Sequence, residues 1–149
     1  MSDNAEAQIV RHQDPLMLPP RTSVMEAARQ MHARHVRAVL VTEGDANLVG
    51  IFTECDAISR VLAAGRDPVA TTLADVMTNN PETITPQQSA TEVLRLMKEA
   101  HVRHLPVVDR DKVVGIISID HRLKRIVKIL EERERRESDA RRIRGLEPL

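Results

Sequence analysis

The stretch that decides the fold is Ser23-Val-Met-Glu-Ala-Ala-Arg-Gln-Met-His-Ala-Arg-His-Val-Arg37, because its pattern recurs 66 residues later as Ser89-Ala-Thr-Glu-Val-Leu-Arg-Leu-Met-Lys-Glu-Ala-His-Val-Arg103. Over residues 20–41 nine pairs are identical at this offset: Pro20 and Pro86, Ser23 and Ser89, Glu26 and Glu92, Arg29 and Arg95, Met31 and Met97, His35 and His101, Val36 and Val102, Arg37 and Arg103, and Val41 and Val107. After the loop 43–47 the offset falls to 65, and Val49-Gly50-Ile51 then matches Val114-Gly115-Ile116. Self-similarity at a fixed period predicts a tandem duplication of one structural unit.

Each copy of the unit contains one long helix with a recognisable start. Ser23 and Ser89 are each followed three residues later by a glutamate, Glu26 and Glu92. This spacing predicts a capping box, in which the serine hydroxyl accepts a backbone N–H and the glutamate reaches back to the cap. Apolar residues then recur at helical spacing: Val24, Ala27, Ala28 and Met31 in the first copy, and Ala90, Val93, Leu94 and Met97 in the second. Each helix should therefore bury one face.

Short strands surround this helix in both copies. We expect them at residues 16–18, 38–41 and 48–53 in the first copy and at 83–85, 105–108 and 113–118 in the second. A second helix follows, from Asp56 to Ala64 with Gly65 as its stop in the first copy, and from Asp120 onward in the second. The unit is thus β-α-β-β-α, which predicts an α+β fold, an α/β sandwich-like arrangement of two tandem repeats.

The predicted organisation has five segments. Residues 1–9 are expected to be disordered, 10–65 to form the first repeat, 66–72 the linker, 73–130 the second repeat, and 131–149 a charged C-terminal helix and tail. A unit of about 60 residues buries only about 60% of its unfolded surface, so the two repeats should pack together about a pseudo-two-fold axis. The tail interleaves glutamates with arginines, which is typical of a solvated or partner-binding helix.

Composition excludes several classes of protein. Acidic and basic residues balance at 22 each, and Phe52 is the only aromatic residue. Without a basic excess or rings for base stacking, nucleic-acid binding is not expected. Cys55 is the only cysteine, so an intrachain disulfide cannot form and a cytoplasmic location fits best. No apolar run is long enough to span a membrane, and the polar N-terminus lacks a signal-peptide pattern, so no membrane association is expected.

The repeat resembles the cystathionine β-synthase (CBS) domain, and the tandem arrangement resembles a Bateman module. The resemblance covers about residues 10–130, and it is carried by Val49-Gly-Ile-Phe-Thr-Glu-Cys-Asp56, by His101-Val-Arg-His-Leu-Pro-Val-Val-Asp109 and by Val114-Gly-Ile-Ile-Ser118. It implies that an adenosine-containing ligand (AMP, ADP, ATP or S-adenosylmethionine) binds between the repeats. It also implies regulation in place of catalysis, and a homodimer. Ala27, Ala28 and Met31 are expected to give a flat apolar surface for helix packing between the two chains.

Thr53 and Asp56 are the main candidate ligand-binding residues. They lie where a strand ends and a helix begins. The free backbone N–H groups and partial positive charge of a helix start favour an anion. The resemblance implies that the aspartate binds the ribose and that the threonine lies nearby, and a carboxylate can accept hydrogen bonds from both ribose hydroxyls. The alternative is that Thr53 and Asp56 only cap their helix, because the same spacing is typical of a capping box.

The second copy departs from this pattern. Ser118 stands at the position of the threonine, but three residues later the chain has His121 and no acid. Basic residues at the start of the middle strand, which the resemblance places near phosphates, are Arg37 in the first copy and Arg103 with His104 in the second. For His104 a packed histidine without ligand contact is an equal alternative.

Other motifs give weaker signals. His32 with His35 and His101 with His104 have the spacing of a metal pair, but the pairs are out of register in the repeat and lack an acidic third ligand, so no metal site is predicted. Cys55 has no resolving cysteine and is interpreted as a small packed residue. The sequence holds no recognisable nucleophile and base, metal cage or glycine-rich phosphate loop, so we do not expect an enzyme.

The sequence therefore predicts a regulatory module that senses an adenine nucleotide or S-adenosylmethionine and acts on an unidentified partner protein. No cofactor is obligatory, and Mg²⁺ is an optional companion of the phosphates. The alternative is a ligand-free structural or oligomerisation module whose nucleotide sites have decayed, since the second aspartate is missing.

Overall fold

Two similar halves make up the computed structural model, which describes residues 10–119 and 121–143 and, among these, the side chains of 14–119 and 128–142. The first repeat contains β2 (Met17–Leu18), α2 (Val24–Arg34), β3 (Ala38–Glu43), β4 (Asn47–Thr53), α3 (Glu54–Asp56) and the π-helical η1 (Ala57–Leu62). The second contains α5 (Ala90–Ala100), β6 (His104–Asp109), β7 (Lys112–Ile119) and α6 (His121–Ile143). At the start of the first repeat lies β1 (Val10–Gln13), and at the start of the second lie α4 (Leu73–Val76) and β5 (Thr78–Asn79). The predicted α+β fold of two tandem repeats is confirmed, and the expected disorder of 1–9 falls outside the described residues.

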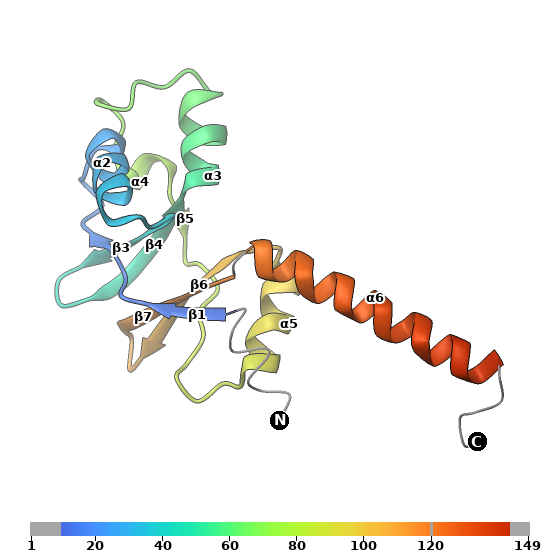
Figure 1. The fold of residues 1–149 in the computed structure, drawn as a ribbon. Helices are drawn as coiled ribbons and strands as arrows, with labels where there is room; N and C mark the ends of the chain where they lie inside the picture. The colour runs from blue at the N-terminus through green and yellow to red at the C-terminus, as the bar shows by residue number, and fades with distance from the viewer. Residues whose placement is uncertain (1–9, 120, 144–149) are drawn as a thin grey trace.

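Each half builds a small sheet, the two are joined by one residue pair into a seven-stranded sheet, and they exchange their first strands. In the first half β4 pairs with β3 on one side and, on the other, with β5 from the start of the second repeat. In the second half β7 pairs with β6 and with β1 from the start of the first repeat. The first strand of each repeat thus completes the sheet of the other repeat (Figure 1).

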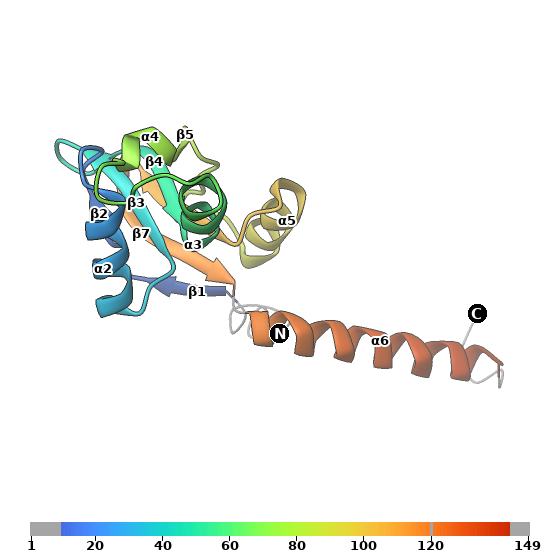
Figure 2. The same ribbon diagram turned by 90° about the horizontal axis from the view of Figure 1, so that it is seen from above.

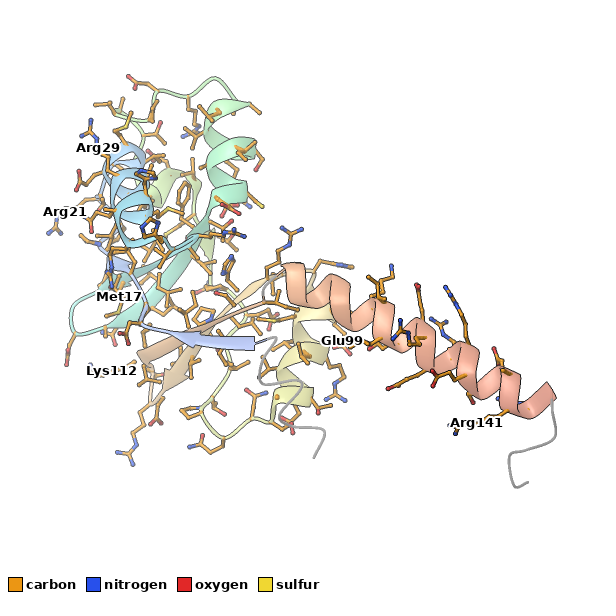
Figure 3. The ribbon with its side chains drawn as sticks, viewed as in Figure 1. Met17, Arg21, Arg29, Glu99, Lys112 and Arg141 are labelled. Carbon is orange, nitrogen blue, oxygen red and sulfur yellow. The ribbon has the colours of Figure 1, made fainter. Side chains whose placement is uncertain are left out.

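The two sheets meet at the tips of their hairpins. Asn47 of β4 pairs with Lys112 of β7, and the Lys112 ammonium donates to the Asp45 backbone carbonyl at 2.7 Å and lies 3.1 Å from its carboxylate. Figure 3 labels Lys112 at this contact. Between the sheets lies a hydrophobic core that the two repeats share, made of Ala38, Leu40, Ile51, Val113 and Ile116. Because this core takes residues from both repeats, neither half is complete alone.

Helices α2 and α5 each cover a core of their own repeat. Val24, Ala27 and Met31 of α2 pack on Val39, Val41 and Phe52, together with Leu73 and Val76 of α4. Val93 and Met97 of α5 pack on Ile84, Leu105 and Val107. In both views α2 and α4 lie beside the first sheet, whereas α5 lies apart from them, with the second half (Figures 1 and 2).

Of the capping box predicted at the start of α2, the serine hydrogen bond forms and the glutamate hydrogen bond does not. Ser23 Oγ accepts the Glu26 N–H at 3.1 Å, but the Glu26 carboxylate accepts a hydrogen bond from Gln30 instead of returning to the cap. Reciprocal boxes form instead at Thr53 with Asp56 and at Thr72 with Asp75. The shorter aspartate reaches its own cap, while the longer glutamate has a partner one turn along its helix.

Two further predictions need correction. The strand expected at 83–85 is reduced to one parallel bridge between Ile84 and Val107, because the Thr85 N–H donates to the Gln88 side chain at 2.8 Å and leaves the sheet. The helix expected from Asp56 begins at Glu54, because Thr53 is its N-cap, and it continues as a π-helix. Gly65, with φ +71°, lies in the turn that follows this helix, as expected.

The segment expected as a linker lies against the start of α2. Val24 N donates to Thr71 O at 2.9 Å, Met25 N donates to Pro68 O at 3.0 Å, and the Thr71 side chain is buried. This docking places α4 on the core of the first repeat and directs the chain into β5.

The cap of α4 predicts a pH effect on stability. Hydrogen bonds from the backbone N–H and the hydroxyl of Thr72 hold the pKa of Asp75 below its usual value of 3.8, and Arg66 adds a smaller effect in the same direction. Since the folded pKa lies below the unfolded one, the stabilisation is complete above pH 3.8 and is lost as pH falls through the folded pKa. Asp75→Asn should therefore lower the free energy of unfolding at neutral pH, and the difference from wild type should shrink below pH 4 in denaturant titrations. A difference independent of pH would contradict the assignment.

Helix α6 continues from the second repeat and extends away from both halves (Figures 1 and 2). Its side chains from Lys128 to Arg142 are exposed or half-exposed, including Ile129 and Leu130. The predicted charged helix over 131–143 is present, and residues 144–149 fall outside the described residues. No helix among the described residues is long and apolar enough to cross a membrane.

Candidate functional site

Equivalent residues of the two repeats meet in one cleft. Helices α2 and α5 both end at a histidine in the left-handed conformation, His35 with φ 53° and His101 with φ 54°. The chain then turns directly into β3 and β6, so that Arg37 and Arg103 lie beside the ends of β4 and β7. A cleft of about 940 Å³ lies there, and its lining includes four equivalent pairs: His35 and His101, Val36 and Val102, Arg37 and Arg103, and Thr53 and Ser118. Since its walls are related by the repeat, the cleft lies between the two halves.

Six of the seven predicted site residues line this cleft: Arg37, Thr53, Asp56, Arg103, His104 and Ser118. The seventh, His121, begins α6, and its side chain lies outside the described residues. Residues that the sequence reasoning missed also line the cleft, namely His35, Glu54, Thr78, Asn80, Glu82 and His101. For His35 and His101 the sequence did hold a signal, because the same residue occurs at equivalent positions of the two repeats. The sequence held no such signal for Thr78, Asn80 and Glu82, because they reach the cleft through the exchange of strands between the repeats.

Asp56 is held firmly at the end of β4. Its Oδ2 accepts hydrogen bonds from the Thr53 N–H at 2.9 Å and from the Thr53 hydroxyl at 3.2 Å, while the Asp56 N–H donates to Thr53 Oγ1 at 3.4 Å. Its Oδ1 lies 3.6 Å from Arg60 Nε, and the Asp56 side chain is only 14% exposed. The cap foreseen as the alternative interpretation is therefore formed, and the same carboxylate lines the cleft.

The corresponding place in the second repeat has a different partner. His104 Nδ1 lies 2.8 Å from Ser118 Oγ, within hydrogen-bond distance. In the first repeat the position of His104 is held by Ala38, which is buried. An imidazole thus stands beside the second hydroxyl, whereas a carboxylate stands beside the first.

The charges of the cleft are also unequal between the repeats. Arg37 Nε lies 4.0 Å from the Glu54 carboxylate, which offsets part of its charge. By the repeat offset, the residue equivalent to Glu54 is Ile119, so Arg103 has an apolar residue where Arg37 has an acid. The first repeat therefore supplies the carboxylates of Glu54 and Asp56, and the second supplies a more positive wall.

The histidine pairs do not form a metal centre within the part of the chain that the structure describes. There, no group of three or more histidine, cysteine or acidic side chains is placed to hold a metal ion. Of the pair His32 and His35, only His35 lines the cleft. Cys55 is exposed in the cleft wall, not packed as the sequence suggested.

Comparison with known protein families finds the same domain twice along the chain. The family model of the CBS domain matches residues 7–63 and residues 73–128. The chain belongs to the CBS domain family. A CBS domain-containing protein of Arabidopsis thaliana, CBSCBSPB3, is 41% identical over 104 residues, which cover 70% of this chain. The match covers 19% of that relative, so this CBS pair spans about a fifth of the relative's length.

Solved structures of CBS pairs have the same fold. One, a CBS domain pair crystallised with 5′-methylthioadenosine and S-adenosyl-L-methionine, is 28% identical and has a TM-score of 0.66, with 74% of this chain and 89% of that chain covered. Another, a hexameric CBS-CP12 protein from bloom-forming cyanobacteria, is 26% identical with a TM-score of 0.68, covering 88% of this chain and 81% of that one. Among similar CBS pairs, then, one binds adenosine compounds and another assembles into an oligomer.

Proposed function

We propose that this CBS pair is a regulatory module that binds one adenosine-containing ligand between its repeats and transmits that state to a partner protein. The observation that carries the proposal is the cleft of about 940 Å³ with the Asp56 carboxylate at one repeat and Arg103 at the other. The structural neighbour with bound 5′-methylthioadenosine and S-adenosylmethionine supports the ligand class. Regulation in place of catalysis, and a cytoplasmic location, are parts of the same proposal.

Asp56 is the residue that recognises the ribose in this proposal. Its Oδ2 is engaged by Thr53, whereas among the described side chains the contact at Oδ1 is the longer one with Arg60, so that Oδ1 retains the capacity to accept a hydroxyl. A ribose diol would bind Oδ1 with one hydroxyl and replace the Thr53 hydroxyl at Oδ2 with the other. Hydrogen bonds to a charged acceptor contribute about 1.5–3 kcal/mol, which is enough to distinguish ribose from deoxyribose.

The other end of the ligand faces the second repeat. Arg103, His101 and His104 line that wall, and Arg103 has no acid at the position that Glu54 takes beside Arg37. An anionic group such as a phosphate is favoured there by charge-assisted hydrogen bonds. Mg²⁺ is not needed for this arrangement and stays an optional companion of a di- or triphosphate.

The first test is a thermal-shift panel of the full chain with AMP, ADP, ATP, S-adenosylmethionine, NAD and cyclic dinucleotides. A ligand at 100 times its dissociation constant adds about 2.7 kcal/mol to the stability of the folded state, which raises the midpoint by several degrees. We expect such a shift for at least one adenosine compound and none for the matching guanosine compound. No shift with any adenosine compound would contradict the proposal.

The inequality of the two repeats predicts one ligand per chain. The second repeat places His104 against Ser118 and has His121 where the first has Asp56, so the position equivalent to Asp56 offers no carboxylate to a second diol. Calorimetric titration should give a stoichiometry near one, and His121→Asp should strengthen a second binding event. Two equal sites in the wild-type chain would contradict this prediction.

A second candidate function, a ligand-free structural or oligomerisation module, is favoured by two observations. The Ser118 hydroxyl already has a protein partner in His104, and η1 exposes two large apolar side chains, Ile58 at 61% and Leu62 at 69%.

The sequence had suggested Ala27, Ala28 and Met31 as the surface of a homodimer. This was wrong for Ala27 and Met31, which are buried in the core of their own repeat, because the face of α2 that carries them covers the sheet.

We propose that the homodimer forms through η1. Leu62→Glu should raise the dissociation constant of the dimer about tenfold or more, because it places a charge in an apolar interface. Val69→Glu is the matched control, since Val69 is 65% exposed in the turn beyond η1. Light scattering at micromolar concentration should give twice 16.7 kDa for the wild type and for the control. A wild-type mass of 16.7 kDa would reject the dimer.

The output surface of the module is α6 in this proposal. The helix begins at the second repeat beside β7, which ends at the cleft, and its far part extends from the body with exposed charged side chains (Figure 1). A ligand can redirect it only if the contacts of α6 differ between the two states. The regulated partner would then contact the segment 128–142.

A further inference from the structure

Arg60 of the first repeat connects the candidate ribose-binding carboxylate to the end of α4, at the start of the second repeat. Its Nε lies 3.6 Å from Asp56 Oδ1, and its Nη1 donates to the backbone carbonyl of Val76 at 2.9 Å. The two contacts use different nitrogens of one planar guanidinium, so the position of either partner affects the other. Arg60 is therefore more than a member of an i,i+4 pair on the surface of η1.

The Val76 carbonyl is itself part of the cleft's support. Val76 is the last residue of α4, and the carbonyl groups in the last turn of a helix have no hydrogen-bond partner inside that helix. The next residue, Met77, packs on the core of the first repeat, and Thr78 pairs with Ile51 and lines the cleft. Arg60 thus joins the carboxylate of one cleft wall to the segment that forms another.

The contacts of Asp56 are divided between its two oxygens. Thr53 fixes Oδ2 through a backbone N–H and a hydroxyl, and Arg60 is the charged group beside Oδ1. A carboxylate held at both oxygens cannot turn about its Cβ–Cγ bond without losing a contact. A diol needs both oxygens in a fixed orientation, because its two hydroxyls have a fixed spacing.

We propose that Arg60 is a positioning residue that orients the Asp56 carboxylate toward the ribose and couples it to the end of α4. This inference rests on the proposed function, since it assigns the ribose to Asp56. Arg60 itself is 46% exposed and makes a long ion pair, so it contributes little to global stability. Its main effect is on the selectivity of the cleft.

The test compares AMP with 2′-deoxy-AMP in calorimetric titrations of the full chain. Arg60→Met keeps the apolar stem but removes both contacts, and we expect AMP affinity to fall three- to tenfold while that of 2′-deoxy-AMP changes less than twofold. The preference for ribose should fall by the ratio of these two changes. Arg60→Lys, which cannot bridge both partners, should be intermediate. Arg29→Met is the matched control, because Arg29 lies exposed on α2 away from the cleft (Figure 3).

A second readout needs no ligand. The Thr53 N–H donates to Asp56 Oδ2, so a less constrained carboxylate should speed hydrogen exchange of the Thr53 amide several-fold, while the Ala27 amide in α2 stays unchanged. Equal loss of affinity for both nucleotides, or unchanged ribose preference, would overturn the positioning role. If the wild type binds neither nucleotide, the same comparison is made with the adenosine compound that raises the thermal midpoint. If no adenosine compound does, ribose recognition at Asp56 fails, and the Thr53 amide decides about Arg60: faster exchange supports positioning of the carboxylate, and unchanged exchange overturns it.

Discussion

Asp56→Ala should weaken binding of the adenosine ligand about ten- to a hundredfold while the chain stays folded. The substitution removes two charged acceptor oxygens from a cleft wall, and each hydrogen bond to such an acceptor contributes about 1.5–3 kcal/mol. A hundredfold loss corresponds to about 2.7 kcal/mol, which one or two of these bonds account for. Calorimetric titration measures the effect directly.

The matched control for this prediction is Asp75→Ala. Asp75 has the same spacing to a threonine, and its Oδ2 accepts the Thr72 N–H at 3.0 Å, as Asp56 Oδ2 accepts the Thr53 N–H at 2.9 Å. Both variants lose a helix cap, but only Asp56 lines the cleft. Equal affinities in the two variants would show that Asp56 is only a cap, the alternative interpretation of the Thr53–Asp56 pattern.

Gly50→Ala should lower the free energy of unfolding by about 1–3 kcal/mol, the usual range for an overpacked core. A Cβ on Gly50 would lie 2.4 Å from Met77 Sδ and 3.0 Å from the Thr78 carbonyl oxygen. Both neighbours belong to the exchanged segment, since Asn79 and Thr78 pair with Gly50 and Ile51. The added methyl group therefore pushes β5 away from β4, and ligand affinity should fall with stability because Thr78 lines the cleft.

A double-mutant cycle checks the cause of that effect. In the background of Met77→Ala the closest contact of the new methyl group is removed, so the additional cost of Gly50→Ala should be smaller. Denaturant titration of the four proteins gives the coupling free energy. Strictly additive costs would mean that Gly50 is needed for a reason other than the approach of β5.

Much of the fold followed from the repeat offset. Ser23 and Ser89 each begin a helix, and the hairpins lie where the aligned apolar stretches predicted them. The offset also placed Thr53 and Ser118 at equivalent strand ends, and they do line one cleft. These features depend on local patterns of 10 to 15 residues, which a sequence carries directly.

The parts that escaped prediction depend on distant partners. The strands β1 and β5 are only four and two residues long, and they are strands because a hairpin of the other repeat offers them a free edge. Their own residues carry no alternation long enough to detect. The contacts of His104 with Ser118 and of Arg60 with Val76 join residues 14 and 16 positions apart, and they depend on how the side chains meet across a hairpin and beyond η1. The cleft lining at Thr78 and Glu82 was missed for the same reason.

The most direct test of the account is an amide NMR titration of the full chain with AMP. If an adenosine ligand binds between the repeats with its ribose at Asp56, the largest shifts should occur in two separate segments, 53–56 and 101–104, and residues at the hairpin tips such as Asp45 and Lys112 should be unaffected. Shifts that saturate but lie outside both segments, or a spectrum unchanged by millimolar AMP, ADP, ATP and S-adenosylmethionine alike, would contradict the claim that this cleft is the ligand site.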